Sequence, residues 1–295
     1  YNKPYKTKTE DIMDYSQILS QQFNIKEEYA KNIITLLDDG NTIPFIARYR
    51  KEMHGSMDDQ LLREFAEKLE YLRGLDKRRD EIRSLIDAQE KLTDEINLAL
   101  DKAATLSELE DIYRPYRPKR KTRASIAKEK GLEPLANDIL KQEKGFDPSK
   151  SAVDYIDEEK GVTSVEDAIQ GAMDIIAELV SDNAEIRKRI RNLTNANGVL
   201  VSVATDEEKD SVYKNYYDYK EPVKKIAGHR VLAVNRGEKE GFLKVSVETD
   251  SEKPLNSIFR AMITDKNQLC SDIIREACTD AYQRLIYPSI EREVR

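Results

Sequence analysis

DDQLLREFAEKLEYLRGLDKRRDEIRSLIDAQ, residues 58–89, is the stretch that decides the fold. Its apolar residues recur at three- and four-residue spacing, which predicts one long amphipathic helix that begins at Asp58 or Asp59. These apolar residues are Leu61, Leu62, Phe65, Leu69, Leu72, Leu75, Ile82, Leu85 and Ile86. Roughly thirty residues make about 45 Å of helix. Because the heptad fails around residues 74–79, we expect a central helix that others pack against, not a coiled coil.

The residues before this helix predict shorter helices that form a helix-turn-helix-like unit. Asn24 followed by Glu27 has the form of a capping box, and Gly40 can end the helix that follows. A second short helix is expected to start at Thr42, which caps it, with Pro44 in its first turn, where the missing N–H is harmless.

Capping residues also mark helix starts beyond residue 89. They are expected at Thr93, at Thr105 with Glu108, and at Thr163 with Glu166. Helices are predicted over residues 165–180 and 184–193, and again from about Asn267.

Residues 199–247 no longer follow the helical spacing of apolar residues, and their pattern predicts a small β element. Valines at 199, 201 and 203 alternate with small or polar residues, and residues 231–234 and 242–247 are strand-like runs. The stretch between those two runs, residues 236–241, lacks the glycine spacing and the Lys-Ser/Thr ending of a phosphate-binding loop. We interpret it as a connecting turn.

The fold class is therefore mainly α: an elongated multi-helix scaffold with an N-terminal helix-turn-helix-like unit, a long central helix and a small β element near residues 230–248. We expect three parts, residues 1–57, 58–198 and 199–295. Charged residues make up 36% of the chain, and no run of about eighteen uncharged apolar residues occurs, so we expect a soluble protein without a membrane span.

The cysteines and histidines predict neither a disulfide nor a metal site. Cys270 and Cys278 lie eight residues apart on one expected helix, about 12 Å along its axis, which is too far for a disulfide. We expect reduced thiols in a cytoplasmic protein. His54 and His229 have no zinc-site spacing with these cysteines, and no catalytic motif occurs, so we predict no metal site, no cofactor and no catalytic residue.

The most distinctive local feature is a basic segment at residues 113–130, with eight basic residues and one acid in a chain of net charge −7. Prolines at 115 and 118 interrupt any helix and favour an extended backbone that can follow phosphates, with Tyr113 and Tyr116 available to stack on bases. The candidate nucleic-acid contacts are Arg114, Arg117, Lys119, Arg120, Lys121 and Arg123. The alternative is a proline-stiffened connector whose charges are merely solvated or pair with acidic helices nearby.

Two further basic clusters are open to simpler interpretations. Ile186 and Ile190 are expected to face the protein core. Arg187 and Arg191 share another face of the same helix and are predicted to form a solvated outer face. Residues 42–52 end in several basic side chains, which the helix dipole alone favours. DNA readout by a helix-turn-helix is the other reading, although the turn that should touch bases is apolar.

Several of these segments resemble the bacterial Tex family of transcription accessory proteins. The similar stretches are residues 42–52, 109–120, 229–243, 280–285 and 288–295. The resemblance implies a mostly helical scaffold with a helix-turn-helix unit, a long central helix, a nuclease-like domain, a helix-hairpin-helix module and an OB-fold RNA-binding domain. It implies that this chain holds the first helical units and the lead-in to the nuclease-like domain, and that the later domains lie beyond it.

We therefore expect a non-enzymatic, monomeric, cytoplasmic scaffold region associated with RNA or DNA, with RNA polymerase as a candidate partner. Binding by this chain is expected to be weak, because the family's affinity is ascribed largely to the OB fold. The alternative is a protein-interaction module that docks RNA polymerase or another factor, with nucleic-acid binding confined to the domains beyond this chain.

Overall fold

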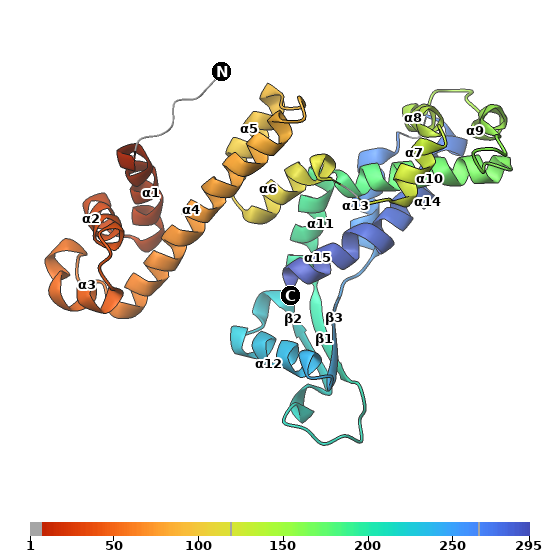
Figure 1. The fold of residues 1–295 in the computed structure, drawn as a ribbon. Coiled ribbons are helices and arrows are strands. Elements are labelled where there is room, and N and C mark those ends of the chain that lie inside the picture. Colours follow the sequence, from red (N-terminus) through yellow and green to blue (C-terminus); the bar gives the residue numbers. More distant parts are fainter. Residues whose placement is uncertain (1–7, 119, 265) are drawn as a thin grey trace. The chain divides into compact units, whose positions relative to one another are not determined.

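A computed structural model describes residues 8–118, 120–264 and 266–295, and the described chain is mainly α-helical, which confirms the predicted fold class (Figure 1). It forms two compact units, Tyr1–Leu109 and Glu110–Arg295. The three-part division at residues 57 and 198 stays a prediction. None of the helices in the described ranges combines the length and the apolar character needed to cross a membrane.

The first unit is organised around one long helix, as predicted. Its helices are α1 (Lys8–Phe23), α2 (Glu27–Asp38), α3 (Ile43–Tyr49), α4 (Asp59–Asp87), α5 (Asp94–Lys102) and the first half of α6 (Leu106–Tyr113). Leu62, Phe65 and Leu69 of α4 enter the core that α1, α2 and α3 share. The Asp58 carboxylate caps α4 by accepting a hydrogen bond from the Leu61 N–H at 2.8 Å.

Two predicted caps in this unit are wrong: Asn24 does not cap α2, and the side chain of Thr42, at the start of α3, makes no cap hydrogen bond. α2 begins at Glu27 without a side-chain cap, and Asn24 takes a left-handed φ of 50° just after α1. Asparagine tolerates that conformation because its short polar side chain can hydrogen-bond locally. Gly40, with a φ of 80°, follows the end of α2 as predicted. Pro44 lies in the first turn of α3, also as predicted.

The second unit is built around α10 (Val165–Asp182), which packs against helices from both earlier and later parts of the sequence. The other helices are α7 (Arg123–Glu129), α8 (Glu133–Lys141), α9 (Pro148–Ala152), α11 (Ala184–Asn197), α12 (Gly228–Lys239), α13 (Glu252–Met262), α14 (Gln268–Asp280) and α15 (Tyr287–Val294). A π-helical turn, Ala281–Ile286, joins α14 to α15. The cap of α10 is Ser164, one residue later than predicted, and α13 was not predicted.

A three-stranded antiparallel sheet in the order β2-β1-β3 lies in the same unit. Its strands are β1 (Val199–Ala204), β2 (Asp218–Pro222) and β3 (Leu243–Glu248). The alternating valines form β1 and the run at 242–247 forms β3, but residues 231–234, predicted as a strand, belong to α12. Four apolar residues are too few for their periodicity to separate helix from strand.

The predicted turn at residues 236–241 is mostly the last turn of α12. Gly237 is buried there rather than placed in a turn, and a Cβ atom on it would lie 2.6 Å from Leu243 Cδ1. The missing side chain therefore lets α12 approach β3. The chain reverses at Gly241, whose φ is 79°.

Cys270 and Cys278 are both free and fully buried on α14. Burial raises the pKa of the Cys278 thiol to about 12, so the reactive thiolate is scarce at neutral pH. We expect neither cysteine to react with iodoacetamide in the folded protein at neutral pH, and both to react in denaturant. Mass spectrometry counts the adducts; rapid alkylation of the folded chain would contradict this packing.

Candidate nucleic-acid interface

The predicted basic segment connects α6 to α7 in the second unit. Arg114–Tyr116 form a short 3-10 turn, and Arg117 is extended with φ −67° and ψ 132°. The Thr122 side chain then starts α7 through a capping box with Ser125. The proline-rich stretch therefore breaks the helix as predicted, although its first turn is helical rather than extended.

An acidic row on α10 faces this segment. Asp174, Glu178 and Asp182 are spaced four residues apart, which places them along one face of the helix. Asp182 forms an ion pair with Arg114, with an N–O distance of 3.4 Å. Glu178 accepts a hydrogen bond of 3.0 Å from the Thr122 hydroxyl. The acidic row therefore contacts the basic segment near its start, at Arg114, and near its middle, at Thr122.

Burial, and to a lesser extent neighbouring charges, shift the pKa values of the groups along this contact. Burial raises the pKa of Asp174, while the positive charges of Arg123 and Arg284 oppose that rise. Arg284 Nη2 lies 3.8 Å from Asp174 Oδ1. Burial, followed by repulsion from Arg187, lowers the pKa of Arg114. Arg114 is therefore placed as part of the packed structure, not as a freely solvated charge.

The predicted contact residues divide into two groups. Arg114 and Arg117 are engaged internally, because Arg114 pairs with Asp182 and Arg117 pairs with Glu110. Tyr113 is buried, so the expectation that it is available to stack on bases is wrong.

The outward-facing group consists of Arg120, Lys121 and Arg123, all of which are exposed. Lys121 has a loose pairing of 3.6 Å with Glu129, in which both side chains remain about two-thirds exposed. Lys119 lies outside the described residues. Arg117 is also about half exposed but is paired with Glu110, so Arg120, Lys121 and Arg123 are the described candidate contacts that are exposed and not held by a close ion pair.

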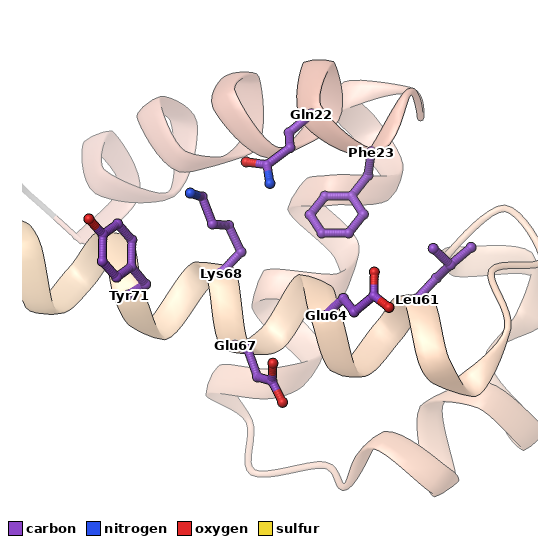
Figure 2. A pocket seen from close by; sticks show the side chains of 7 residues that line it. All are labelled: Gln22, Phe23, Leu61, Glu64, Glu67, Lys68 and Tyr71. Atoms are coloured by element: carbon purple, nitrogen blue, oxygen red, sulfur yellow. The ribbon is translucent and has the colours of Figure 1, made fainter. Parts of the chain in front are cut away.

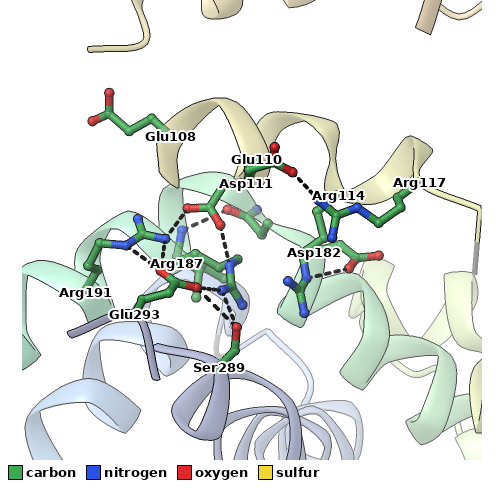
Figure 3. A network of polar contacts seen from close by, with 12 residues as sticks. Glu108, Glu110, Asp111, Arg114, Arg117, Asp182, Arg187, Arg191, Ser289 and Glu293 are labelled. Atoms are coloured by element: carbon green, nitrogen blue, oxygen red, sulfur yellow. Dashed lines mark hydrogen bonds and ion pairs between the residues drawn. The ribbon is translucent and has the colours of Figure 1, made fainter. Parts of the chain in front are cut away.

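The prediction that Arg187 and Arg191 form a solvated outer face is wrong. Arg187 Nε donates to Asp111 Oδ1 at 2.5 Å, and its Nη2 donates to Glu293 Oε1 at 2.8 Å and to Ser289 Oγ at 3.0 Å. Arg191 contacts the same two carboxylates, at 2.7 Å from Asp111 Oδ2 and 2.9 Å from Glu293 Oε2. Figure 3 shows each carboxylate bridging both arginines.

This network joins α6, α11 and α15. The Arg187 side chain is only 1% exposed and that of Asp111 only 5%. Burial disfavours the charge of Arg191, but the hydrogen bonds that it donates to Asp111 and Glu293, with their negative charges, outweigh this and raise the pKa of the arginine. Two positive and two negative groups balance, so the cluster fixes the end of α6, directly before the basic segment begins.

No group of three or more His, Cys, Asp and Glu side chains that could hold a metal ion occurs among the described residues. His54 is fully buried in the first unit, and neither of its ring nitrogens has a hydrogen-bond partner in the described part of the chain.

Each of the two units contains a region that matches a known protein family. Residues 13–87 match the Tex-like protein N-terminal domain, and residues 143–295 match the Tex central region-like family. The chain is 43% identical over 290 residues to the uncharacterized protein YdcI of Bacillus subtilis, covering 96% of this chain and 40% of that protein.

Two further relatives carry functional names. The chain is 39% identical over 238 residues to the transcriptional accessory protein Tex of Neisseria gonorrhoeae, covering 80% of this chain and 31% of that protein. It is 30% identical over 308 residues to the human S1 RNA-binding domain-containing protein 1, covering 98% of this chain and 30% of that protein. The chain thus spans 30% to 40% of the length of these relatives.

Proposed function

The chain belongs to the Tex family, and on that premise we propose that it is a non-enzymatic scaffold region that associates with nucleic acid and with the transcription machinery. Two relatives support this proposal through their names, one as a transcriptional accessory protein and one as a protein with an S1 RNA-binding domain.

The observation that carries the proposal is the exposure of Arg120, Lys121 and Arg123 beside a segment that is otherwise fixed by ion pairs. Arg120 and Lys121 lie on the short connection between Arg114 and Thr122, which are both held by α10, and Arg123 is the first residue of α7. A cationic loop on a fixed base can contact phosphates without losing much conformational freedom on binding. We assign the phosphate contact to these three residues and a positioning role to Arg114 and Arg117.

The proposal places the protein in the cytoplasm as a monomer, with RNA polymerase as a candidate partner. Its two buried free thiols support a reducing compartment. The helix-turn-helix-like arrangement of α2 and α3 belongs to the same proposal. The scaffold role is supported by the charge networks, which tie together helices from distant parts of the sequence.

A protein-interaction module that docks RNA polymerase or another factor is the alternative. It is favoured by the internal pairing of Arg114 with Asp182 and of Arg117 with Glu110, which withdraws two of the predicted phosphate contacts. The binding experiment below separates the two functions.

Reversing the charge of Arg120, Lys121 and Arg123 to Glu is expected to weaken binding of single-stranded RNA at least tenfold at low salt, because three phosphate contacts become repulsive. Fluorescence anisotropy with a labelled oligonucleotide measures the affinity. The matched control reverses Lys141, Lys150 and Lys160, which are exposed in the same unit and change the net charge equally. Equal affinity of the two triple variants would reject the assignment.

A further inference from the structure

α3 carries an exposed pair of aromatic side chains that the proposed function leaves unexplained. Phe45 and Tyr49 lie one helical turn apart and are 36% and 58% exposed. Their ring centroids are 5.3 Å apart and the rings are tilted by 45°. The buried residue of this helix is Ile46, between the two rings in sequence. The helix therefore anchors itself through Ile46 and leaves both rings partly exposed beside it.

Cations surround the two rings. The Arg50 guanidinium lies 5.7 Å from the Phe45 centroid, and that of Arg48 lies 6.0 Å from the Tyr49 centroid. Lys51 is also exposed. No ion pair among the described residues engages Arg48, Arg50 or Lys51. These guanidinium groups are held mainly over aromatic rings, which leaves their N–H donors available for an anion.

A second exposed ring in the same unit has the opposite surroundings. Tyr71 of α4 is 40% exposed, with Lys68 Nζ 4.9 Å from its centroid. Figure 2 shows Tyr71 next to Lys68, and Glu64 and Glu67 are the acidic residues that line the same pocket of about 550 Å³ between α1 and α4. These carboxylates would repel a phosphate. An aromatic ring beside a cation therefore occurs on both α3 and α4, and it is the excess of positive charge that distinguishes the α3 surface from the surface around Tyr71.

We propose that Phe45 and Tyr49 stack on the unpaired bases of a single-stranded nucleic acid, while Arg48 and Arg50 contact its phosphates. Aromatic rings and guanidinium planes beside a positive surface are the features that bind single strands without sequence preference. Because a duplex hides its base faces, the same rings would have nothing to stack on there. This inference rests on the proposed function and adds a second contact, in the other unit, to the one at Arg120, Lys121 and Arg123.

The surface charge favours a nucleic acid over a protein partner. Tyrosine and arginine are also common in protein–protein hot spots, but such interfaces are depleted of lysine and acidic residues at their centre. Here three cations, Arg48, Arg50 and Lys51, adjoin one acid, Glu52. The net positive charge matches a polyanion.

The chain contains no tryptophan, so a single introduced one reports on its own position. In the full chain, Tyr49→Trp provides an indole at the proposed stacking site, and Tyr71→Trp provides a matched control in the same unit. Titration with polyuridylate is expected to quench the fluorescence of the Tyr49→Trp variant and to leave that of the Tyr71→Trp variant unchanged. Quenching of both or of neither overturns the proposal.

Affinity gives the second readout. Tyr49→Ala is expected to weaken polyuridylate binding about 5- to 150-fold, which corresponds to ~1–3 kcal/mol for one stacked base. Tyr49→Phe keeps the ring and is expected to bind polyuridylate as the wild type does. Tyr71→Ala removes a ring outside the proposed site and is also expected to bind with wild-type affinity. Circular dichroism checks that each variant is folded.

The outcomes separate this inference from the proposed function. Polyuridylate binding that survives Tyr49→Ala but falls on charge reversal at Arg120, Lys121 and Arg123 overturns the α3 site alone. Such a result would leave the α3 surface to a protein partner. A wild-type chain that binds no polyuridylate overturns both. Equal or tighter binding to duplex DNA that depends on Tyr49 overturns the stacking mechanism.

Discussion

Arg187→Met is expected to destabilise the Glu110–Arg295 unit by about 3–5 kcal/mol, the range for removing one partner of a buried ion pair. The loss comes mainly from the carboxylates that stay behind. Asp111 is almost fully buried, and without Arg187 it keeps only Arg191 as a charged partner within the network. Urea unfolding followed by circular dichroism measures the change.

Two comparisons isolate the buried charge. Arg189→Met changes an exposed arginine two residues away on α11 and is expected to alter the stability by no more than about 0.5 kcal/mol. Combining Arg187→Met with Asp111→Leu removes both buried partners, so the double variant should lose less than the sum of the single changes. A loss below about 1 kcal/mol for Arg187→Met would show that the arginine is solvated, as the sequence alone predicts.

Phe65→Ala is expected to destabilise the first unit by about 3–5 kcal/mol, through lost burial and the cavity left behind. Phe65 is fully buried on α4, and its ring centroid lies 5.3 Å from that of Phe23. It holds α4 against the helices that position α3. The same urea titration reports the loss.

Leu61→Ala is the matched control for this cavity. Leu61 lies one turn before Phe65 on α4 and is 41% exposed, so its truncation should leave a much smaller effect, about 0.5 kcal/mol. Similar losses for the two variants would mean that α4 is not packed by the face on which Phe65 lies.

Features with a clear period could be predicted from the sequence. α4 follows nine apolar residues at helical spacing, and β3 follows alternation over residues 242–247. The short run at 231–234 fits either period; in the fold it is part of α12, which packs against β3 at the close approach of Gly237 to Leu243. That contact joins two elements, so local spacing does not contain it.

The buried arginine was missed for a different reason. Ile186 and Ile190 indicated the core face of α11 correctly, but that face is wider and also includes Arg187 and Thr194. Thr194 lies seven residues after Arg187, close to two helical turns, so the two residues share a face of α11. That spacing is the one local feature that connects Arg187 with a second buried polar residue. The partners Asp111 and Glu293 lie 76 and 106 residues away from Arg187. No count of charges along the chain could bring them together.

For the basic segment, too, the acidic side chains of α10 that contact it lie far away in the sequence. The segment contains eight cations, and its sequence leaves open whether they contact phosphates or pair with acidic helices, because the acidic row on α10 is visible only once α10 is placed beside it. Counting charges therefore located the candidate interface, while the division into positioning residues and exposed contacts required the fold.

The most direct test of a phosphate contact within this chain is the salt dependence of its binding to single-stranded RNA, compared between the wild type and the Arg120→Glu, Lys121→Glu, Arg123→Glu variant. Each phosphate contact contributes about 0.7 to the slope of log affinity against log salt. We expect wild-type binding to fall with salt, and the slope of the variant to be shallower by about 2. Identical slopes, or no wild-type binding at low salt, would contradict a nucleic-acid contact at these residues.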